Sequence, residues 1–222
     1  IFAHIWHNFD SVLIDHYRDS GQMKKLDGRR QEMTLTFIDH LSPNCDGRPQ
    51  EADIDILVFH YTGLKTLKEA LDRLVNPVAQ VSAHYLISEG GEIYCLVKED
   101  HRAWHAGVSY WRGRTDVNAH SIGIELENPG LDFGYRTFPQ SQMKALTELC
   151  HDILSRHSIP ARNIIGHSDI APRRKNDPGE LFDWEFMANQ GIGLWPDSTS
   201  GGHPIGSPER LLSSLGYEVD DI

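Results

Sequence analysis

Two histidines and one aspartate, far apart in the sequence, are the residues whose types point to metal chemistry. His60 closes an apolar run, and His167 opens a polar, turn-rich segment in which Asp177 follows ten residues later. Two imidazoles and a carboxylate with an open fourth position form the donor set of catalytic zinc sites, whereas structural zinc sites are usually closed by cysteines. Taken singly, His60 is more readily explained as a hydrogen-bonded neutral histidine than as a ligand, and the later segment as an ordinary surface turn.

Neither an HExxH motif nor a CxxC pair occurs, so a metal site in this chain must be assembled from distant segments. The run from Ile54 to His60 is apolar on both faces, which predicts a strand buried on both sides of a sheet. A short strand from Asn163 to Gly166 leads into His167. Ligands of open α/β sheets gather outside the carboxyl ends of strands, which is where His60 stands.

The remaining hydrophobic periodicity predicts strands and helices over residues 33–195. Apolar residues at helical spacing indicate helices, and apolar runs indicate strands, two of which Gly90 and Gly91 join as a hairpin. The predicted helices are 66–74, 139–156 and 183–190, and the further strands are 34–38, 83–88, 92–97 and 120–127. This order predicts an α/β domain with a central mixed β-sheet flanked by helices.

Both ends of the chain differ from this domain. Residues 1–32 are irregular and lack the charged and apolar regions of a signal peptide, so our hypothesis is that Met33 is the natural start and that the extension is extraneous. Residues 196–222 begin as a linker rich in Gly, Ser and Pro, followed by a predicted short helix from Pro208 to Tyr217. One helix buries no core of its own, so this tail is either a docked appendage or the truncated start of a second module.

Composition and charge argue against several classes of function. The 222 residues carry a formal net charge of −11, which disfavours nucleic acid and anionic membranes as partners. No apolar run approaches the roughly 18–20 residues of a transmembrane helix. Cys45, Cys95 and Cys150 have no paired spacing and favour a reducing compartment, with a periplasmic protein that keeps free thiols as the alternative.

Five motifs, in order along the chain, carry a family resemblance. They are Val-Phe-His-Tyr-Thr (58–62), Val-Ser-Ala-His (81–84), Ala-Trp-His-Ala-Gly (103–107), Ser-Ile-Gly-Ile-Glu-Leu-Glu (121–127) and Gly-His-Ser-Asp-Ile-Ala-Pro-Arg-Arg-Lys-Asn-Asp-Pro-Gly (166–179). In these motifs the chain resembles the zinc-dependent N-acetylmuramoyl-L-alanine amidases of the amidase_2 family, and more remotely T7 lysozyme and the peptidoglycan recognition proteins. The resemblance covers about residues 42–195. It implies the fold of that family, one zinc ion per chain, and bacterial peptidoglycan or muropeptide fragments as substrate.

The same resemblance implies roles for individual residues. The two histidines and the aspartate named above would bind zinc. Glu125, the first acid of the Ile-Gly-Ile-Glu motif, would take a proton from the attacking water and deliver it to the leaving amine. Lys175, two residues before Asp177, would stabilise the oxyanion. Glu127 lies two residues beyond Glu125, on the same strand face, and is the main rival for the role of base.

Weaker grounds predict five contacts with substrate, at Tyr61, Trp104, His105, Arg114 and Arg174. Trp104 and His105 belong to the Ala-Trp-His-Ala-Gly motif and are expected in a cleft wall, although core packing explains Trp104 equally well. The two arginines would meet the carboxylates of an acidic stem peptide, although a solvated surface position is the simpler interpretation of each. Gln80 stands where the recycling amidases carry an arginine, which puts strict selectivity for the anhydro sugar in doubt.

The prediction is therefore an enzyme that hydrolyses a linear amide. Water activated by zinc would cleave the bond between the lactyl group of (anhydro-)N-acetylmuramic acid and L-alanine, in peptidoglycan turnover or recycling. The alternatives are a non-catalytic peptidoglycan-binding module and a zinc peptidase acting within the stem peptide. The expected compartment is the cytoplasm, although residues 111–113 and 191–196 resemble relatives of the periplasm or cell envelope. The sequence leaves the oligomeric state open.

Overall fold

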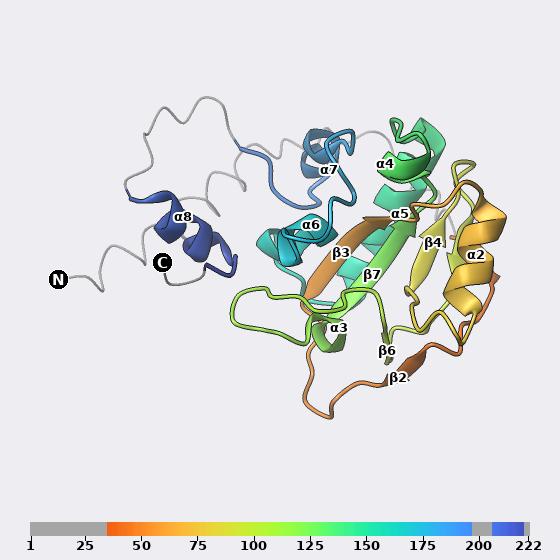
Figure 1. The fold of residues 1–222 in the computed structure, drawn as a ribbon, viewed down its shortest axis with the longest axis horizontal. Helices are drawn as coiled ribbons and strands as arrows, with labels where there is room; N and C mark the ends of the chain where they lie inside the picture. Colours follow the sequence, from red (N-terminus) through yellow and green to blue (C-terminus); the bar gives the residue numbers. More distant parts are fainter. Residues whose placement is uncertain (1–34, 197–205, 220–222) are drawn as a thin grey trace, which may run out of the picture. The chain divides into compact units, whose positions relative to one another are not determined.

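A six-stranded mixed sheet lies at the centre of the computed structural model, which describes residues 35–196 and 206–219 (Figure 1). Its order is β1-β5-β4-β7-β3-β8, with β4, β7, β3 and β8 parallel and with β5 antiparallel to β4. The strands are β1 (Phe37–Asp39), β3 (Ile56–Tyr61), β4 (Tyr85–Ile87), β5 (Ile93–Cys95), β7 (Ser121–Leu126) and β8 (Ile164–Gly166). The predicted α/β class with a mixed sheet is confirmed.

The helices that the periodicity predicts are also present. Thr66 caps the first of them, because its side chain accepts a hydrogen bond from the Glu69 amide at 3.2 Å. The helices are α2 (Leu67–Val75), α3 (Val117–His120), α4 (Gly130–Phe133), α5 (Gln140–Arg156), α6 (His167–Ile170), α7 (Trp184–Asn189) and α8 (Pro208–Leu215), with a 3₁₀ turn η1 (Ala161–Asn163). The sequence did not predict α3, α4 and α6, nor a second sheet of two short antiparallel strands, β2 (Cys45–Gly47) and β6 (His101–Ala103).

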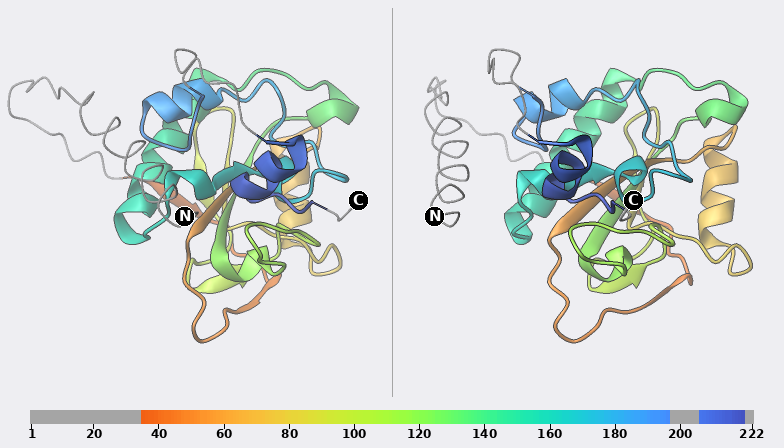
Figure 2. Two further views of the ribbon diagram at one scale, coloured as in Figure 1. Left: turned by 90° about the vertical axis from the view of Figure 1, so that its left-hand side faces the viewer. Right: turned by 60° about the vertical axis from the view of Figure 1, so that its left-hand side comes forward.

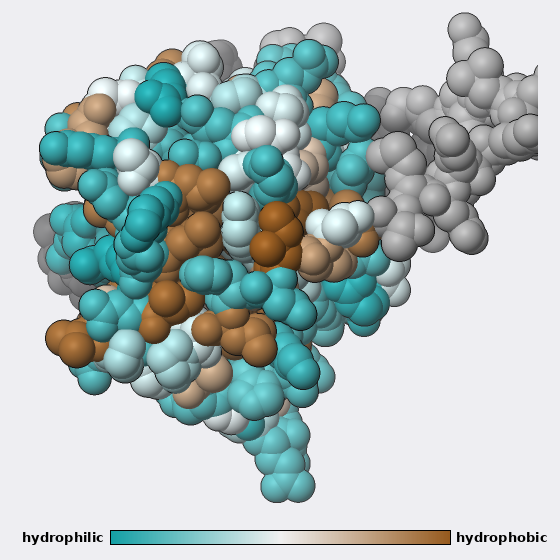
Figure 3. Space-filling view, turned by 90° about the vertical axis from the view of Figure 1, so that its right-hand side faces the viewer, coloured by the Kyte–Doolittle hydropathy of each residue, from teal (hydrophilic) through white to brown (hydrophobic). Residues whose placement is uncertain are grey.

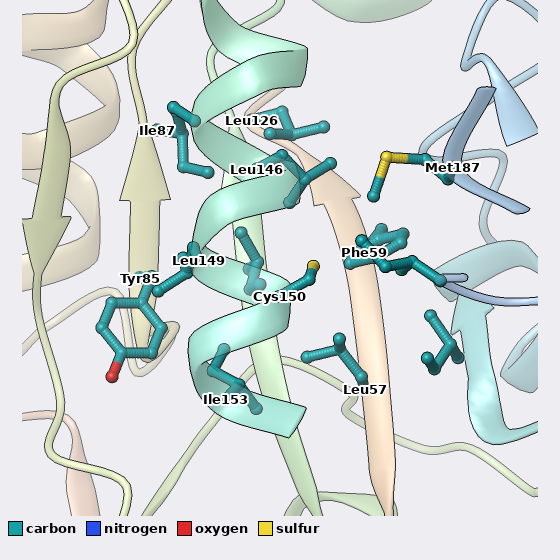
Figure 4. Packing of buried hydrophobic residues seen from close by; sticks show 14 of the residues in the cluster. Leu57, Phe59, Tyr85, Ile87, Leu126, Leu146, Leu149, Cys150, Ile153 and Met187 are labelled. Atoms are coloured by element: carbon teal, nitrogen blue, oxygen red, sulfur yellow. The ribbon is translucent and has the colours of Figure 1, made fainter. Parts of the chain in front are cut away.

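Alternation along β3 divides the core into two faces. Leu57 and Phe59 point to one face, where they pack with buried residues of α5 and α7 such as Leu146 and Met187 (Figure 4). Val58 points to the other face, which α2 covers farther along the sheet. Figure 2 shows α2 and α5 on opposite sides of the sheet. His60 shares the face of Val58, because side chains two residues apart lie on the same side.

The tail after residue 205 packs on the domain through the Tyr217 side chain and through the backbone of the preceding residue. The ring of Tyr217 meets the ring of Trp111 edge to face, with 5.3 Å between their centroids. Its hydroxyl donates to the Asp169 carboxylate in α6. The Gly216 carbonyl accepts a hydrogen bond from the Arg112 amide at 2.9 Å. The predictions for residues 1–32 and for most of the linker lie outside the described residues.

Part of the surface near α2 and α4 is apolar. Leu131 and Phe133 of α4 are exposed. Figure 3 views the molecule from the side of α2 and α4 and shows hydrophobic residues in a broken band on that face. The Lys65 ammonium lies 5.1 Å from the centroid of the Phe133 ring, so a cation covers part of it. None of the helices in the described ranges has both the length and the apolarity needed to cross a membrane.

Candidate metal centre

The carboxyl ends of the neighbouring strands β7, β3 and β8 bring the candidate ligands together. His60, the fifth residue of β3, pairs in register with Glu125 of β7. Gly166 ends β8 opposite Phe59, so His167 follows beside His60. The loop after α6 returns to this edge, where the Asp177 carbonyl accepts a hydrogen bond from the Ser168 amide at 2.9 Å. The fold thus positions all three residues with backbone hydrogen bonds.

Three side-chain atoms form a nearly equilateral triangle at this edge. His60 Nδ1 lies 2.9 Å from His167 Nδ1 and 3.0 Å from Asp177 Oδ2, and the latter two atoms are 3.0 Å apart. All three residues are buried. In the described part of the chain this is the one group of three or more His, Cys, Asp or Glu side chains arranged to hold a metal ion.

The surroundings of these groups leave three candidate metal-binding atoms that face one another. His167 Nε2 lies 3.1 Å from the Ala106 carbonyl oxygen, which can only accept, so Nε2 carries a proton and Nδ1 is the nitrogen that remains to bind a metal. Burial, reinforced by His167, lowers the pKa of His60 to about 4, so its ring is neutral at pH 7. Burial alone would raise the pKa of Asp177, but the neighbouring imidazoles hold it well below its ordinary value.

A divalent cation fits this donor set. A nitrogen lone pair and a carboxylate oxygen at 3.0 Å repel each other unless a proton or a metal cation lies between them. Ligands placed tetrahedrally around zinc at its usual bond lengths are separated by about 3.3 Å, slightly more than the observed spacing. Two imidazoles and one carboxylate also match the borderline donor preference of zinc. The geometry therefore supports a metal site with three protein ligands.

Glu125 lies beside this triangle without a partner for one of its oxygens. Its Oε2 atom is buried and has no hydrogen-bond partner among the described residues. Burial, together with the charge of Asp177, raises the pKa of Glu125 to about 8, while the charge of Lys175 opposes the rise. Buried polar atoms are normally satisfied, and a carboxyl group with a strongly shifted pKa beside a candidate metal site indicates a functional role.

Lys175 lies on the loop between α6 and Asp177. Its amide donates to the Ala171 carbonyl at 3.1 Å, which continues the turn that begins at His167. Its positive charge is close enough to lower the pKa values of both His60 and Glu125. The ammonium group therefore faces the same region as the candidate base.

The rival base Glu127 is engaged elsewhere. It follows the last residue of β7, and its Oε2 atom accepts a hydrogen bond from the Glu89 amide at 2.9 Å. That bond ties the end of β7 to the hairpin loop. Of the two acids, Glu125 has the unpartnered oxygen and stands in register with His60.

The structure separates the five predicted substrate residues. Arg174 lies on the loop between His167 and Asp177, with its guanidinium donating to the Val108 carbonyl at 2.9 Å and to the Ala106 carbonyl. Tyr61 points to the face of β3 opposite His60, where its ring lies 5.5 Å from that of Tyr135. Arg174 therefore ties its own loop to residues 106–108, and Tyr61 packs on the face of the sheet opposite His60.

Two more of the five have partners other than the metal centre. Arg114 pairs with Asp55, which precedes β3 and lies about 16 Å along the strand from His60. Arg102 first, and then the Trp104 indole, stabilise the Asp46 carboxylate and lower its pKa. Arg114 is thus paired at the opposite end of β3 from His60, and the Trp104 indole is turned toward the small sheet.

His105 is buried behind His60 instead of lining an open wall. Its Nδ1 lies 3.0 Å from His60 Nε2, and its amide donates to Asn118 Oδ1 at 3.1 Å. The Ala106 amide donates to the same oxygen at 2.8 Å. Sequence reasoning missed Asn118, because nothing in the spacing of a polar residue before a strand shows that it holds a loop.

Comparison with known proteins gives this geometry a family. The sequence model of Amidase_2, described as N-acetylmuramoyl-L-alanine amidase, matches residues 50–180. The chain belongs to the Amidase_2 family. The segment matched includes all three candidate ligands, Glu125 and Lys175. The predicted family and enzyme class are confirmed, and the protein is an N-acetylmuramoyl-L-alanine amidase.

Two kinds of bacterial amidase, AmiD and AmpD, are among the relatives of this amidase. It is 44% identical over 189 residues to the N-acetylmuramoyl-L-alanine amidase AmiD of Escherichia coli (strain K12), covering 75% of this chain and 67% of AmiD. It is 39% identical over 162 residues to the 1,6-anhydro-N-acetylmuramyl-L-alanine amidase AmpD of Haemophilus influenzae, covering 65% of this chain and 86% of AmpD.

Solved structures show the same fold. The complex of E. coli AmiD with anhydro-N-acetylmuramic acid-L-Ala-D-γ-Glu-L-Lys superposes with a TM-score of 0.68 at 39% identity, covering 79% of this amidase and 77% of AmiD. AmpDh3 from Pseudomonas aeruginosa superposes with a TM-score of 0.70 at 31% identity, covering 89% and 83% of the two chains. AmpDh3 is also known in complex with an anhydromuramic pentapeptide.

Proposed function

We propose that this amidase uses one zinc ion, held by His60, His167 and Asp177, to hydrolyse the amide between the lactyl group of N-acetylmuramic acid and L-alanine of the stem peptide. The triangle of His60 Nδ1, His167 Nδ1 and Asp177 Oδ2, with sides of 2.9–3.0 Å, carries this proposal. When bound, zinc supplies a Lewis acid and lowers the pKa of a coordinated water to about 7.

Glu125 is the proposed general base and acid. Its unpartnered Oε2 is free to accept the proton that the attacking water loses. Its raised pKa then allows the same carboxyl group to hold that proton and to pass it to the amine of L-alanine as the carbon–nitrogen bond breaks. One residue can thus serve both proton transfers, first from the water and then to the amine.

Lys175 is the proposed electrostatic partner of the reacting carbonyl. Attack on the lactyl carbon places negative charge on the carbonyl oxygen, and a nearby ammonium group stabilises that charge. The influence of Lys175 on Glu125 and His60 supports its position beside the reacting bond. Arg174, at the rim, is the predicted substrate residue whose position still fits contact with a stem-peptide carboxylate.

The proposed substrates are muropeptides that carry the anhydro sugar and, as the alternative, intact peptidoglycan. Bound anhydromuramyl peptides in AmiD and AmpDh3 support the first. The compartment follows the substrate: turnover of small fragments fits the proposed cytoplasmic location, and cleavage of intact wall fits the cell envelope.

Product analysis tests the proposal directly. The purified protein is treated with chelator, divided, and supplied or not supplied with zinc, and each sample is incubated with anhydromuramyl-tripeptide or with sacculi. We expect mass spectrometry to show intact stem peptide released only in the presence of zinc. Shortened peptides would instead identify a zinc peptidase, and tight binding without cleavage would identify a peptidoglycan-binding module.

A further inference from the structure

We propose that His105 is a positioning residue that keeps the proton of the His60 ring on Nε2 and so leaves Nδ1 free for the metal. The inference rests on the proposed metal site, but its test reads the metal-free protein as well. It concerns a side chain that the sequence assigned to the substrate cleft and that the structure instead places behind a ligand.

The His105 ring joins His60 to a serine on β7. Its Nδ1 lies 3.0 Å from His60 Nε2, and its Nε2 lies 3.1 Å from Ser121 Oγ. The rings of His60 and His105 meet at 79°, with 5.1 Å between their centroids. Two histidines and a serine therefore form one buried chain of hydrogen bonds that ends at the metal centre.

A backbone carbonyl fixes the direction of this chain. Ser121 Oγ lies 2.7 Å from the Val117 carbonyl oxygen, which can only accept. The single hydroxyl proton of Ser121 is therefore donated to Val117, and the hydroxyl oxygen must accept a hydrogen bond from His105 Nε2. Among the described residues no carboxylate contacts the His105 ring, so an imidazolium there would be a buried charge without a counter-ion. A neutral ring with its proton on Nε2 has a bare Nδ1.

The bare Nδ1 of His105 then decides the tautomer of His60. It can only accept from His60 Nε2, which places the single proton of the neutral His60 ring on that atom. His60 Nδ1, on the opposite side of the ring, is left with a lone pair facing His167 Nδ1 and Asp177 Oδ2. The reverse direction would put a proton on His60 Nδ1, inside the triangle that the metal must occupy. In many metal sites a hydrogen bond to the other ring nitrogen orients the histidine ligand in this way.

The backbone around His105 is built to accept its ring. A Cβ atom at Gly123 would lie 2.4 Å from His105 Cγ, so the glycine of the Ile-Gly-Ile-Glu motif provides the space for the imidazole. The next residue, Ala106, orients the second histidine ligand, since its carbonyl accepts from His167 Nε2. One short segment, residues 105–106, therefore sets the free nitrogen of both histidine ligands.

Three variants test the role of His105. Ser121→Ala removes the acceptor that fixes the direction of the chain, and His105→Leu removes the acceptor for His60. His105→Asn keeps an oxygen that can accept near the position of Nδ1. Ser42→Ala is the matched control, because Ser42 is a buried serine whose hydroxyl also donates to a carbonyl, that of Leu74, but it lies outside the chain of hydrogen bonds.

Zinc affinity of the metal-free protein is measured by competition with a chromophoric chelator, and the tautomer of His60 by ¹⁵N-detected ring correlations. We expect Ser121→Ala and His105→Leu to weaken zinc binding by about 10- to 100-fold, and His105→Asn to recover most of that loss. In the metal-free wild type the His60 proton should be on Nε2, and in Ser121→Ala a fraction should move to Nδ1. Ser42→Ala should match the wild type in both readouts.

Affinities of Ser121→Ala and His105→Leu within twofold of the wild type would overturn the inference, as would a His60 proton on Nδ1 in the wild-type protein without metal. An equal loss of affinity in Ser42→Ala would also overturn it, because the loss would then follow from general loosening of the core. If His105→Leu does not fold, the other two variants decide. A wild-type protein that binds no zinc would instead reject the proposed function.

Discussion

His60 and Glu125 stand directly opposite each other on the neighbouring parallel strands β3 and β7. Their backbones are about 4.8 Å apart at that point, and both side chains project from the same face of the sheet. A ligand and the candidate base are thus placed by strand register rather than by a loop. Because register is set by the buried residues Val58 and Ile124 and their neighbours, the core of the sheet also fixes the spacing of the site.

The first prediction concerns this pair. Glu125→Gln should lower kcat by about 10²- to 10⁴-fold, because the amide cannot take up the proton of the attacking water. Zinc affinity should stay within a few-fold of the wild type, since the three ligands are unchanged. Steady-state release of stem peptide and chelator competition measure the two quantities. Glu127→Gln is the control and should keep near-normal kcat, because that carboxylate is bonded to the Glu89 amide; a comparable loss there would favour Glu127 as the base.

The second prediction concerns metal removal. A cation that binds only the folded chain should raise the free energy of unfolding by about 2.7 kcal/mol when its free concentration is 100 times the Kd. Thermal unfolding of the wild type should therefore shift upward with added zinc. The same titration of Asp177→Asn should give a much smaller shift, because the triangle loses its anionic donor. Equal shifts in the two proteins would show that zinc stabilises the fold from another site.

The third prediction concerns the dependence of stability on pH. The Glu99 carboxylate accepts hydrogen bonds from the Tyr85 hydroxyl at 2.7 Å, from Arg156 at 2.8 Å and from His157 at 2.6 Å. Burial opposes its charge, but these partners outweigh burial and lower the pKa of Glu99 below its ordinary 4.5. A depressed carboxyl pKa stabilises the fold above about pH 4.5, and that contribution is lost as the pH falls through the folded-state value.

Glu99→Gln should accordingly reduce the free energy of unfolding by about 1–3 kcal/mol at pH 7, and the difference from the wild type should shrink below pH 4.5. Urea unfolding at several pH values measures it. Glu148→Gln is the matched control, because Glu148 forms a surface pair with Lys144 at 3.8 Å and should contribute less than about 1 kcal/mol. A difference for Glu99→Gln that stays constant down to pH 3 would contradict the assignment.

The fourth prediction concerns the tail. Tyr217→Phe removes the hydroxyl that donates to Asp169 and should lower the free energy of unfolding by about 0.5–1.5 kcal/mol. Tyr217→Ala also removes the ring that packs on Trp111 and should lower the free energy of unfolding further. Asp169 Oδ2 accepts from the Gly166 amide at 2.8 Å, just before His167, so zinc affinity should fall in parallel. If neither variant changes urea unfolding, the tail does not stabilise the domain.

Long, strongly patterned elements could be predicted from the sequence almost to the residue, whereas several short ones were missed. The apolar run from Ile54 to His60 and the helical stripe in residues 139–156 were correct to within two residues, because burial on a sheet and on a helix face imposes a period on many residues. The two strands of the small sheet have three residues each, and α6 has four. A segment that short shows no period of its own, so the folded neighbours alone define β2, β6 and α6, whereas the glycine turn at residues 90–91 marked β4 and β5.

The candidate site shows the same division. The metal residues could be found because they close strands or stand in motifs, and their types suit a metal whatever surrounds them. The roles expected for Arg114 and His105 depended on which groups lie beside them. An arginine beside Asp55 and a histidine between His60 and Ser121 look the same in the sequence as ones that face substrate, because the contacts come from segments that are distant in the chain.

The close approach of Gly123 to the His105 ring has a consequence for how sequences of this fold can change. A side chain at position 123 and an imidazole at position 105 cannot occupy the same space. A chain that gains a methyl group at position 123 must therefore give up the histidine at position 105. It then needs another acceptor for Nε2 of the histidine at position 60. We expect these two positions to vary together among relatives, so that the two motifs are inherited as one unit.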